Sequence, residues 1–294
     1  MYSTPITQTN PPCVPAQNVL WFWFDPATAR KLHGTVNDAA RKLQTLAERG
    51  MLLEGLEIFL MPSRVGNSHD WPKDFCRAFA DLSYRTVHIG ETENDFLLQA
   101  ESLRHLRQLH AFLDAHGVKR IILHSHHLEN SRQQCRENLL AYLPGIEICV
   151  ENTGFNNITG HEPEFMSQLC KDFPECTICL DIAHIQDFPQ YKLSDFTENP
   201  IIRQRIREIH ASYSTYNFRS RGIDLYEEKG FSGYDPYHAL YSVLNIMPDD
   251  ETSNLMKQYP VVLEGVLPRE DASLAYLFEE QRIISNHPYI QQQK

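Results

Sequence analysis

Six separate apolar segments of this sequence each end in a side chain that can bind a metal ion. Ile121-Ile122-Leu123, for example, ends in a histidine, and Ile148-Cys149-Val150 ends in a glutamate. Such short apolar runs predict buried β-strands. Because the ending recurs, we expect the strands to deliver these side chains to one place, as at the C-terminal face of a (β/α)8 barrel. The six terminal residues are His88, His124, Glu151, Asp181, His210 and Glu264.

The alternation of apolar runs with helical patterns predicts a single α/β domain, a TIM barrel. The chain has 294 residues, which is enough for a barrel of about 250 residues with extensions. We predict a loose N-terminal extension over residues 1–17 and the barrel domain over residues 18–294. Its first strand is expected at residues 19–24. Helices are expected at residues 36–49, 94–116, 131–142, 162–172, 236–246 and 271–285.

The bulk composition limits where the protein is expected to be located and what it is expected to bind. The net charge of −11 disfavours nucleic acid, which remains an open but not a favoured partner. No apolar run approaches the 18 or so residues of a membrane span, and the polar N-terminus lacks a signal-peptide pattern. We therefore expect a cytoplasmic protein with no membrane partner. Cys176 and Cys179 lie three apart on a predicted strand and should point to opposite faces, which disfavours a redox or zinc pair.

The mixture of imidazole and carboxylate side chains favours zinc, manganese or iron over calcium or magnesium. Six such residues exceed the needs of one four-coordinate ion with an open position. They suffice for two ions that share a carboxylate, an arrangement that can activate water and stabilise a displacement at phosphorus. We therefore expect two divalent ions, with zinc favoured and manganese or iron as alternatives.

Three short motifs carry a resemblance to a known superfamily. They are Glu151-Asn152-Thr153-Gly154, then Asp181-Ile182-Ala183-His184, and then the strand ends Ile209-His210 and Leu263-Glu264. In this order they resemble the xylose isomerase-like TIM barrels, and most closely the endonuclease IV branch (AP endonuclease family 2). The resemblance runs from about the second strand to the eighth, which is most of the chain.

The resemblance implies a set of ligands. The one-metal core shared by the superfamily would be Glu151, Asp181, His210 and Glu264. The endonuclease IV branch would add a second ion on His88 and His124, bridged by Glu151, and His184 matches a histidine that helps to hold a third ion there. That third ion also needs an Asp-x-His in the loop after the seventh strand. Here the sequence offers Asp224-Leu225-Tyr226, and His238 follows at a different spacing, so a third ion is not favoured.

Some positions have competing interpretations. His124 competes with His126 and His127, and we favour His124 because it directly ends the apolar run. His184 is either a ligand or a partner that orients Asp181. Asn152 either orients Glu151, touches the substrate or caps a loop.

Three catalytic functions remain open, beside the alternative of a non-catalytic metal-binding protein. The first is a metal-dependent hydrolase in which metal-bound hydroxide attacks a phosphoester. The second is a sugar or sugar-phosphate isomerase or epimerase with one metal, in which Glu151 and Glu264 are the catalytic pair that moves a proton. The third is a multinuclear iron-dependent oxidase that modifies peptides. The acidic segment at residues 89–95 favours small substrates over duplex DNA, since DNA-inserting surfaces offer apolar wedges and arginines. The oligomeric state stays open.

Overall fold

The computed structural model describes residues 13–15, 55–60, 62, 77, 79–90, 95–155, 157–214, 238–265 and 275–285, with the backbone alone for residues 13–15 and 285. The strand expected at residues 19–24, the helix expected at residues 36–49 and Asp224 lie outside the described residues.

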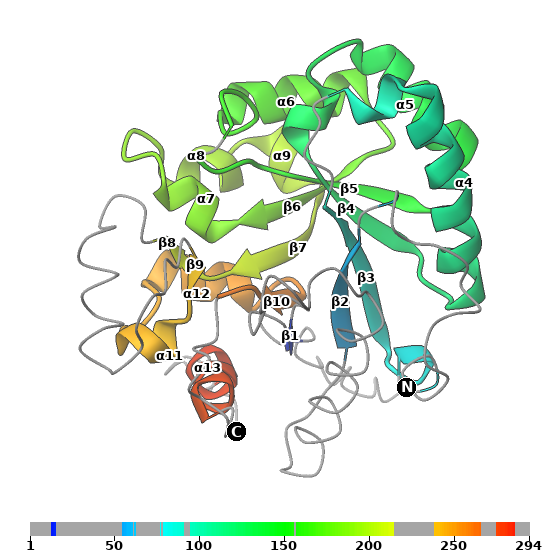
Figure 1. The fold of residues 1–294 in the computed structure, drawn as a ribbon. Coiled ribbons are helices and arrows are strands. Elements are labelled where there is room, and N and C mark those ends of the chain that lie inside the picture. Colours follow the sequence, from blue (N-terminus) through cyan, green and yellow to red (C-terminus); the bar gives the residue numbers. More distant parts are fainter. Residues whose placement is uncertain are drawn as a thin grey trace, which may run out of the picture.

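Eight parallel strands form one sheet in the order β1-β10-β7-β6-β5-β4-β3-β2 (Figure 1). The outermost strands of this order, β1 and β2, lie against each other, so the sheet curves round into a barrel. This is the TIM-barrel class that the sequence predicts. The strands are β1 (Cys13–Pro15), β2 (Gly55–Leu60), β3 (Tyr84–Ile89), β4 (Arg120–His124), β5 (Glu147–Glu151), β6 (Thr177–Asp181), β7 (Ile206–Ala211) and β10 (Val261–Leu263).

One expectation about the N-terminus is wrong. The sequence predicts a loose extension over residues 1–17, yet Cys13–Pro15 forms β1 and pairs in parallel with β10. A three-residue strand that ends in a proline is too short to show a periodic pattern, and its pairing partner lies about 250 residues away in the chain. The division of the chain at residue 18 stays a prediction.

Helices cover the outside of the sheet (Figure 1). The predicted helix at residues 94–116 is divided into η3 and α4, and the one at residues 236–246 is reduced to α11 because β9 occupies its start. The sequence did not indicate α12. The elements are η3 (Phe96–Leu98), α4 (Ala100–Ala115), η4 (Ser125–Leu128), α5 (Arg132–Tyr142), α6 (Pro163–Asp172), α7 (Ile182–Gln186), α8 (Leu193–Thr197), α9 (Pro200–Arg203), β8 (Tyr213–Ser214), β9 (His238–Ala239), α11 (Tyr241–Leu244), α12 (Asp250–Met256) and α13 (Ala275–Ser285).

The alternation of side chains along the strands separates two cores. Ile122, Cys149 and Cys179 form a small buried cluster of their own, apart from the large core to which Cys176 belongs. Each member of the small cluster lies two residues before a predicted ligand, and residues two apart share a face of a strand. The small cluster is therefore a layer inside the barrel beneath the ligands. Cys176 and Cys179 lie in different clusters, as expected from their spacing.

The register of the strands places the ligands side by side. His124 on β4 is paired with Glu151 on β5, and Asp181 on β6 is paired with His210 on β7. The next strand continues the series, because Val262 on β10 is paired with His210 and Glu264 follows two residues later. Parallel strands in a barrel thus bring residues that are far apart in sequence to one rim.

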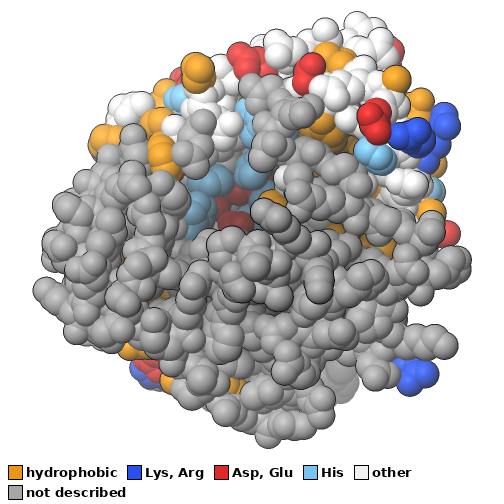
Figure 2. All heavy atoms as spheres, in the orientation of Figure 1, with side chains coloured by type: hydrophobic (Ala, Val, Ile, Leu, Met, Phe, Trp, Pro, Cys, Tyr) orange, Lys and Arg blue, Asp and Glu red, His pale blue; other side chains and the backbone are white. Residues whose placement is uncertain are grey.

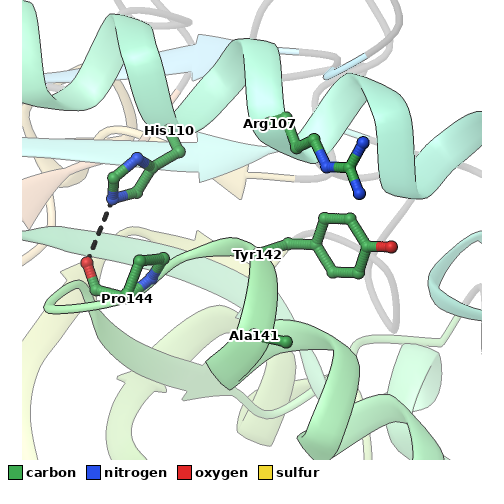
Figure 3. Close-up of a pocket in the computed structure, with 5 residues that line it drawn as sticks. All are labelled: Arg107, His110, Ala141, Tyr142 and Pro144. Carbon is green, nitrogen blue, oxygen red and sulfur yellow. Dashed lines mark hydrogen bonds between the residues drawn. The ribbon is translucent and has the colours of Figure 1, made fainter.

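A surface groove of about 430 Å³ lies between α4 and the end of α5 (Figure 3). Arg107 lies over the ring of Tyr142, 4.8 Å from its centroid, and His110 Nε2 lies 3.0 Å from the carbonyl oxygen of Pro144. The described residues that line the groove include no carboxylate. The groove therefore lacks the acidic ligands that the strand ends offer.

Within the described ranges, no helix has the length and apolar character needed to cross a lipid bilayer.

Candidate metal centre

Glu151, at the end of β5, lies between two groups of histidines. Its Oε2 is 3.1 Å from His88 Nε2 and 3.6 Å from His124 Nε2. Its Oε1 is 3.4 Å from His210 Nδ1 and 3.4 Å from His184 Nδ1. The two oxygens of one fully buried carboxylate therefore face different ligand groups. This is the geometry of a carboxylate that can bridge two ions.

The potential ligand atoms gather into compact groups. In the first, His88, His124 and Glu151 each offer an atom within 4.8 Å of the others. In the second, Glu151 is joined by Asp181, His210 and Glu264 within the same limit. His210 Nδ1 is 2.9 Å from Glu264 Oε2, which ties β7 to β10 across the rim. The structure thus brings together all six strand-end residues that the sequence singled out.

His184 and His238 form a third group with Asp181. Asp181 Oδ1 accepts a hydrogen bond from the backbone N–H of His184 and caps α7, while Oδ2 lies 3.8 Å from His184 Nδ1 and 3.7 Å from His238 Nδ1. His238 reaches the rim because β9 pairs with β8, which follows β7 directly. From the sequence, His238 stands at a different spacing from the expected motif, and the pairing of β8 with β9 brings it beside Asp181.

Several buried polar atoms in these groups are aimed at each other without forming hydrogen bonds among the described residues. They include both carboxylate oxygens of Glu151, Asp181 Oδ2, His88 Nε2 and His210 Nδ1. A buried polar group without a hydrogen bond costs about 1–3 kcal/mol, and a charged group costs more. Cations would satisfy these atoms together, so the residues present fit divalent metal ions.

The charges at the site are strongly coupled. Burial opposes the ionisation of Glu151, but the nearby His210, His124 and His88 outweigh it and hold the pKa of Glu151 well below its ordinary value. Burial, reinforced by Glu264 and Glu151, holds the pKa of Asp181 well above its ordinary value. The clustering of three carboxylates thus leaves one of them costly to ionise, and added positive charge would relieve that cost.

The pKa values of two histidines at the site are also set by burial and by nearby charged groups. Burial holds the pKa of His124 well below its ordinary value even though Glu151 opposes the shift. Burial, with the neighbouring His184, lowers the pKa of His238 to about 4. Both imidazoles are therefore neutral near pH 7, and the neutral form is the one that binds metals.

Two buried glutamates that the sequence analysis missed lie beneath His210. Its Nε2 is 3.4 Å from Glu57 Oε1 and 3.3 Å from Glu208 Oε1. Glu57 also accepts a hydrogen bond of 2.9 Å from Thr86 on the neighbouring strand. Metal-binding histidines commonly direct their second nitrogen to a carboxylate, which fixes the ring and raises its basicity. Glu208 could have been found from the sequence, since it lies two residues before His210 on the same strand.

Asn152 and Gly154 fix the segment after β5. The side-chain amide of Asn152 donates to the carbonyl oxygen of Asp181 at 3.0 Å and accepts from the N–H of Asp181 at 2.9 Å. The carbonyl oxygen of Asn152 lies 2.7 Å from His184 Nδ1. A Cβ at Gly154 would lie 2.6 Å from both His184 Cδ2 and Asp187 Oδ2, so any other residue there would displace these side chains. Asn152 therefore positions the backbone at Asp181.

The groups open to the surface on one side. Histidine and acidic side chains gather in a hollow of the face shown in Figure 2. The side chains of His124 and His238 are 22% and 21% exposed, whereas those of Glu151 and Asp181 are 0% exposed. His124 and His238 therefore lie on the accessible side of the centre, and Glu151 and Asp181 lie at its floor.

The sequence matches no family model, and no curated protein matches it. Comparison of structures does find similar chains. The ASFV AP endonuclease of the AsfvAP:AG crystal structure shares 13% identity at a TM-score of 0.57, over 94% of this chain and 97% of that chain. D-psicose 3-epimerase from Clostridium cellulolyticum H10, solved with D-tagatose, shares 12% identity at a TM-score of 0.54, over 84% and 94%.

A xylose isomerase domain protein from Planctomyces limnophilus shares 11% identity at a TM-score of 0.51, over 83% of this chain and 93% of that chain. These likenesses and the parallel eight-stranded sheet show that the chain has the xylose isomerase-like TIM-barrel fold. At such identities they establish the fold and not the activity. Fold and site together define a xylose isomerase-like barrel with a buried histidine–carboxylate centre suited to metal ions.

Proposed function

We propose that the protein is a metal-dependent hydrolase of phosphoesters with two divalent ions, zinc first among them. The main support for this proposal is that the two carboxylate oxygens of Glu151 face different ligands. Oε2 faces His88 and His124, while Oε1 faces His210. A single-metal enzyme needs only the group of Glu151, Asp181, His210 and Glu264. The two histidines on β3 and β4 have a role as ligands only if a second ion is present.

Two such ions would supply Lewis acidity and would lower the pKa of a water molecule to near neutrality. The residues of the chain position the reactants. The buried oxygens of Glu151 hold the two ligand groups in fixed relation, and Glu57 and Glu208 orient the ring of His210 from below. The partly exposed His124, His184 and His238 form the side that an ester would meet. In-line displacement at phosphorus depends on such fixed positions on either side of the reacting group.

The direct test measures metal content and hydrolysis together. Purified protein is analysed for elements and assayed with bis(p-nitrophenyl) phosphate, then stripped with a chelator and reloaded with Zn²⁺ or Mn²⁺. We expect about two ions per chain, loss of hydrolysis after chelation and recovery on reloading. A content of one ion or fewer per chain in the active protein contradicts the proposal.

A second candidate is a sugar or sugar-phosphate isomerase or epimerase. It is favoured by the completeness of the group of Glu151, Asp181, His210 and Glu264, whose ligand atoms all lie within 4.8 Å of one another without the two extra histidines. In that enzyme one ion would polarise a carbonyl group, and Glu151 and Glu264 would move a proton on and off carbon.

Replacing His88 and His124 separates the two candidates. His88→Asn and His124→Asn should each remove one ion and most of the hydrolysis in the two-metal enzyme. In the isomerase they should leave one ion in place, and incorporation of solvent deuterium into a panel of ketoses should persist. His110→Asn, on α4 beside the groove of Figure 3, is a matched control that should change neither metal content nor activity.

A further inference from the structure

A further histidine cluster lies beside the centre on η4, the turn that follows β4. His126 and His127 are buried side by side there, with their ring centroids 3.9 Å apart. The ring of His126 is also stacked on that of His124, with centroids 5.5 Å apart and planes inclined by 26°. His126 and His127 play no part in the ligand groups around Glu151.

The geometry of the cluster suits one small cation. His124, His126 and His127 each offer a ring nitrogen within 4.8 Å of the other two. Nitrogens bound to one tetrahedral Zn²⁺ at 2.0–2.1 Å lie about 3.4 Å apart, so movements of the rings by about 1 Å would close the site. The Nδ1 of His126 is buried and forms no hydrogen bond among the described residues. This independently indicates that the nitrogen is available to bind a metal ion.

The turn is held in place by its neighbours. Ser125 Oγ donates to the carbonyl oxygen of Gly160 at 2.9 Å, and the N–H of Thr153 donates to the same oxygen at 3.0 Å. A Cβ at Gly160 would lie 2.2 Å from Ser125 Oγ and 3.2 Å from the backbone nitrogen of His126, so the loop after β5 packs directly on η4. The three imidazoles are thus presented by a fixed backbone, which lowers the entropic cost of binding.

We propose that His124, His126 and His127 form an accessory site for one ion of the Zn²⁺ class, distinct from the carboxylate-bearing groups. Three neutral imidazoles favour Zn²⁺, Co²⁺, Ni²⁺ or Cu²⁺ and exclude Mg²⁺ and Ca²⁺, which prefer oxygen. The site has no anionic ligand and is therefore weaker than the groups around Glu151. A neutral imidazole has one nitrogen lone pair to donate, so His124 serves one group at a time. An ion that enters the accessory site therefore takes His124 from the first group, where Glu151 and His88 would still hold the tight ion.

The test is a titration of metal-free protein with Co²⁺, followed by absorption and by equilibrium dialysis. Wild-type protein should bind its tight equivalents first and then one further equivalent at least tenfold more weakly. His126→Gln should abolish the weak equivalent and keep the tight ones. His110→Gln, at a histidine of α4 that lies in the groove of Figure 3 and in none of the ligand groups, should behave as wild type.

The variant His126→Cys tests whether His126→Gln loses the weak equivalent because a ligand is missing or because the structure is disturbed. A thiolate can replace imidazole as a ligand, so this variant should retain the weak equivalent and show a new sulfur-to-cobalt charge-transfer band. Far-UV circular dichroism confirms that each variant is folded. Identical isotherms for wild type and His126→Gln would overturn the proposal, and so would a loss of the tight equivalents in that variant. The experiment measures metal binding alone, so its result tests the accessory site independently of the proposed hydrolysis.

Discussion

Glu151 is the residue on which the whole centre depends, because each of its oxygens serves a different group of histidines. A neutral amide at this position would remove the shared negative charge that offsets the repulsion between two cations. We expect Glu151→Gln to lose both ions and to reduce metal-dependent activity by about 10²–10³-fold. Elemental analysis and the phosphodiester assay measure the two effects.

Glu147 provides the matched control for that variant. It lies on the same strand as Glu151 but at the opposite end, where it accepts hydrogen bonds from Arg120 at 2.9 Å and Thr177 at 2.8 Å. Glu147→Gln should keep both ions and full activity. Retention of metal by Glu151→Gln would contradict the bridging role, as would equal losses in the two variants.

The sequence could predict the six rim residues because each ends its own apolar run, and a local pattern is visible without any knowledge of pairing. Glu57 and His238 could not be found in this way. Glu57 lies within an apolar run, and its partner Thr86 is on a different strand. His238 is 57 residues from Asp181 and reaches it only through the pairing of β8 with β9. Contacts that depend on a second element leave no local signal.

At the scale of elements, Asn152 joins the end of β5 to the end of β6 through two buried hydrogen bonds to the backbone of Asp181. Asn152→Ala leaves both backbone groups without these partners. We expect a loss of about 2–4 kcal/mol in the free energy of unfolding and a loss of about 10–100-fold in metal affinity. Urea denaturation and metal titration measure the two losses.

Asn138→Ala is the control for this prediction. Asn138 on α5 also donates to a backbone carbonyl, that of Leu97 at 2.7 Å, but it lies away from the strand ends. It should cost about 1 kcal/mol of stability and no metal affinity. If Asn152→Ala lost stability but bound metal as tightly as wild type, its positioning role at Asp181 would be excluded.

The start of α11 depends on a buried carboxyl group of α13. Glu280 is fully buried and accepts hydrogen bonds from the N–H groups of Tyr241 and Ser242, at 3.0 and 2.7 Å. Burial nevertheless raises the pKa of Glu280 to about 7. The folded state therefore retains a proton that the unfolded chain, with a pKa near 4.5, has already released.

This difference makes stability fall as the pH rises. The contribution of Glu280 is complete below about pH 4.5, declines through the interval up to pH 7 and is lost above it, with a total of about 3 kcal/mol. In Glu280→Gln the side chain does not titrate, so the difference in unfolding free energy between variant and wild type should shift toward the variant across this interval. Urea denaturation of chelator-treated protein at several pH values measures it. A difference that stays constant with pH refutes the assignment.

The barrel strands from β2 to β7, and β10, could be predicted, since each is an apolar run with a clear end. The weaker elements could not. β1 is only Cys13–Pro15 and exists through its pairing with β10, while β9 falls in a segment whose sequence favours a helix at residues 236–246. Tertiary pairing decides such short elements, and intrinsic propensity does not. The barrel can therefore be predicted from the sequence, but the two-stranded sheet of β8 and β9 beside its rim cannot.

At the scale of the whole molecule, the net charge of the chain affects whether a large polyanion such as DNA can bind. The chain carries 27 basic and 38 acidic side chains. Among the described residues, several arginines already lie in ion pairs with acids, which reduces the positive charge available to phosphates. These pairs are Arg104–Glu101, Arg120–Glu147, Arg132–Asp172, Arg136–Glu175 and Arg282–Glu279.

A duplex-binding protein gains most of its affinity from neutralising backbone phosphates, and the non-specific part alone usually reaches about 10⁻⁴–10⁻⁶ M at physiological salt. We expect this protein to bind duplex DNA containing an abasic-site analogue more weakly than about 10⁻⁴ M, while it hydrolyses small phosphodiesters with its metals bound. Fluorescence anisotropy at several salt concentrations measures the binding, with metal-free protein as the control for direct contact between ion and phosphate. Micromolar affinity with a steep dependence on salt would instead reveal a basic surface that outweighs the net charge of −11, and the substrate would then be nucleic acid.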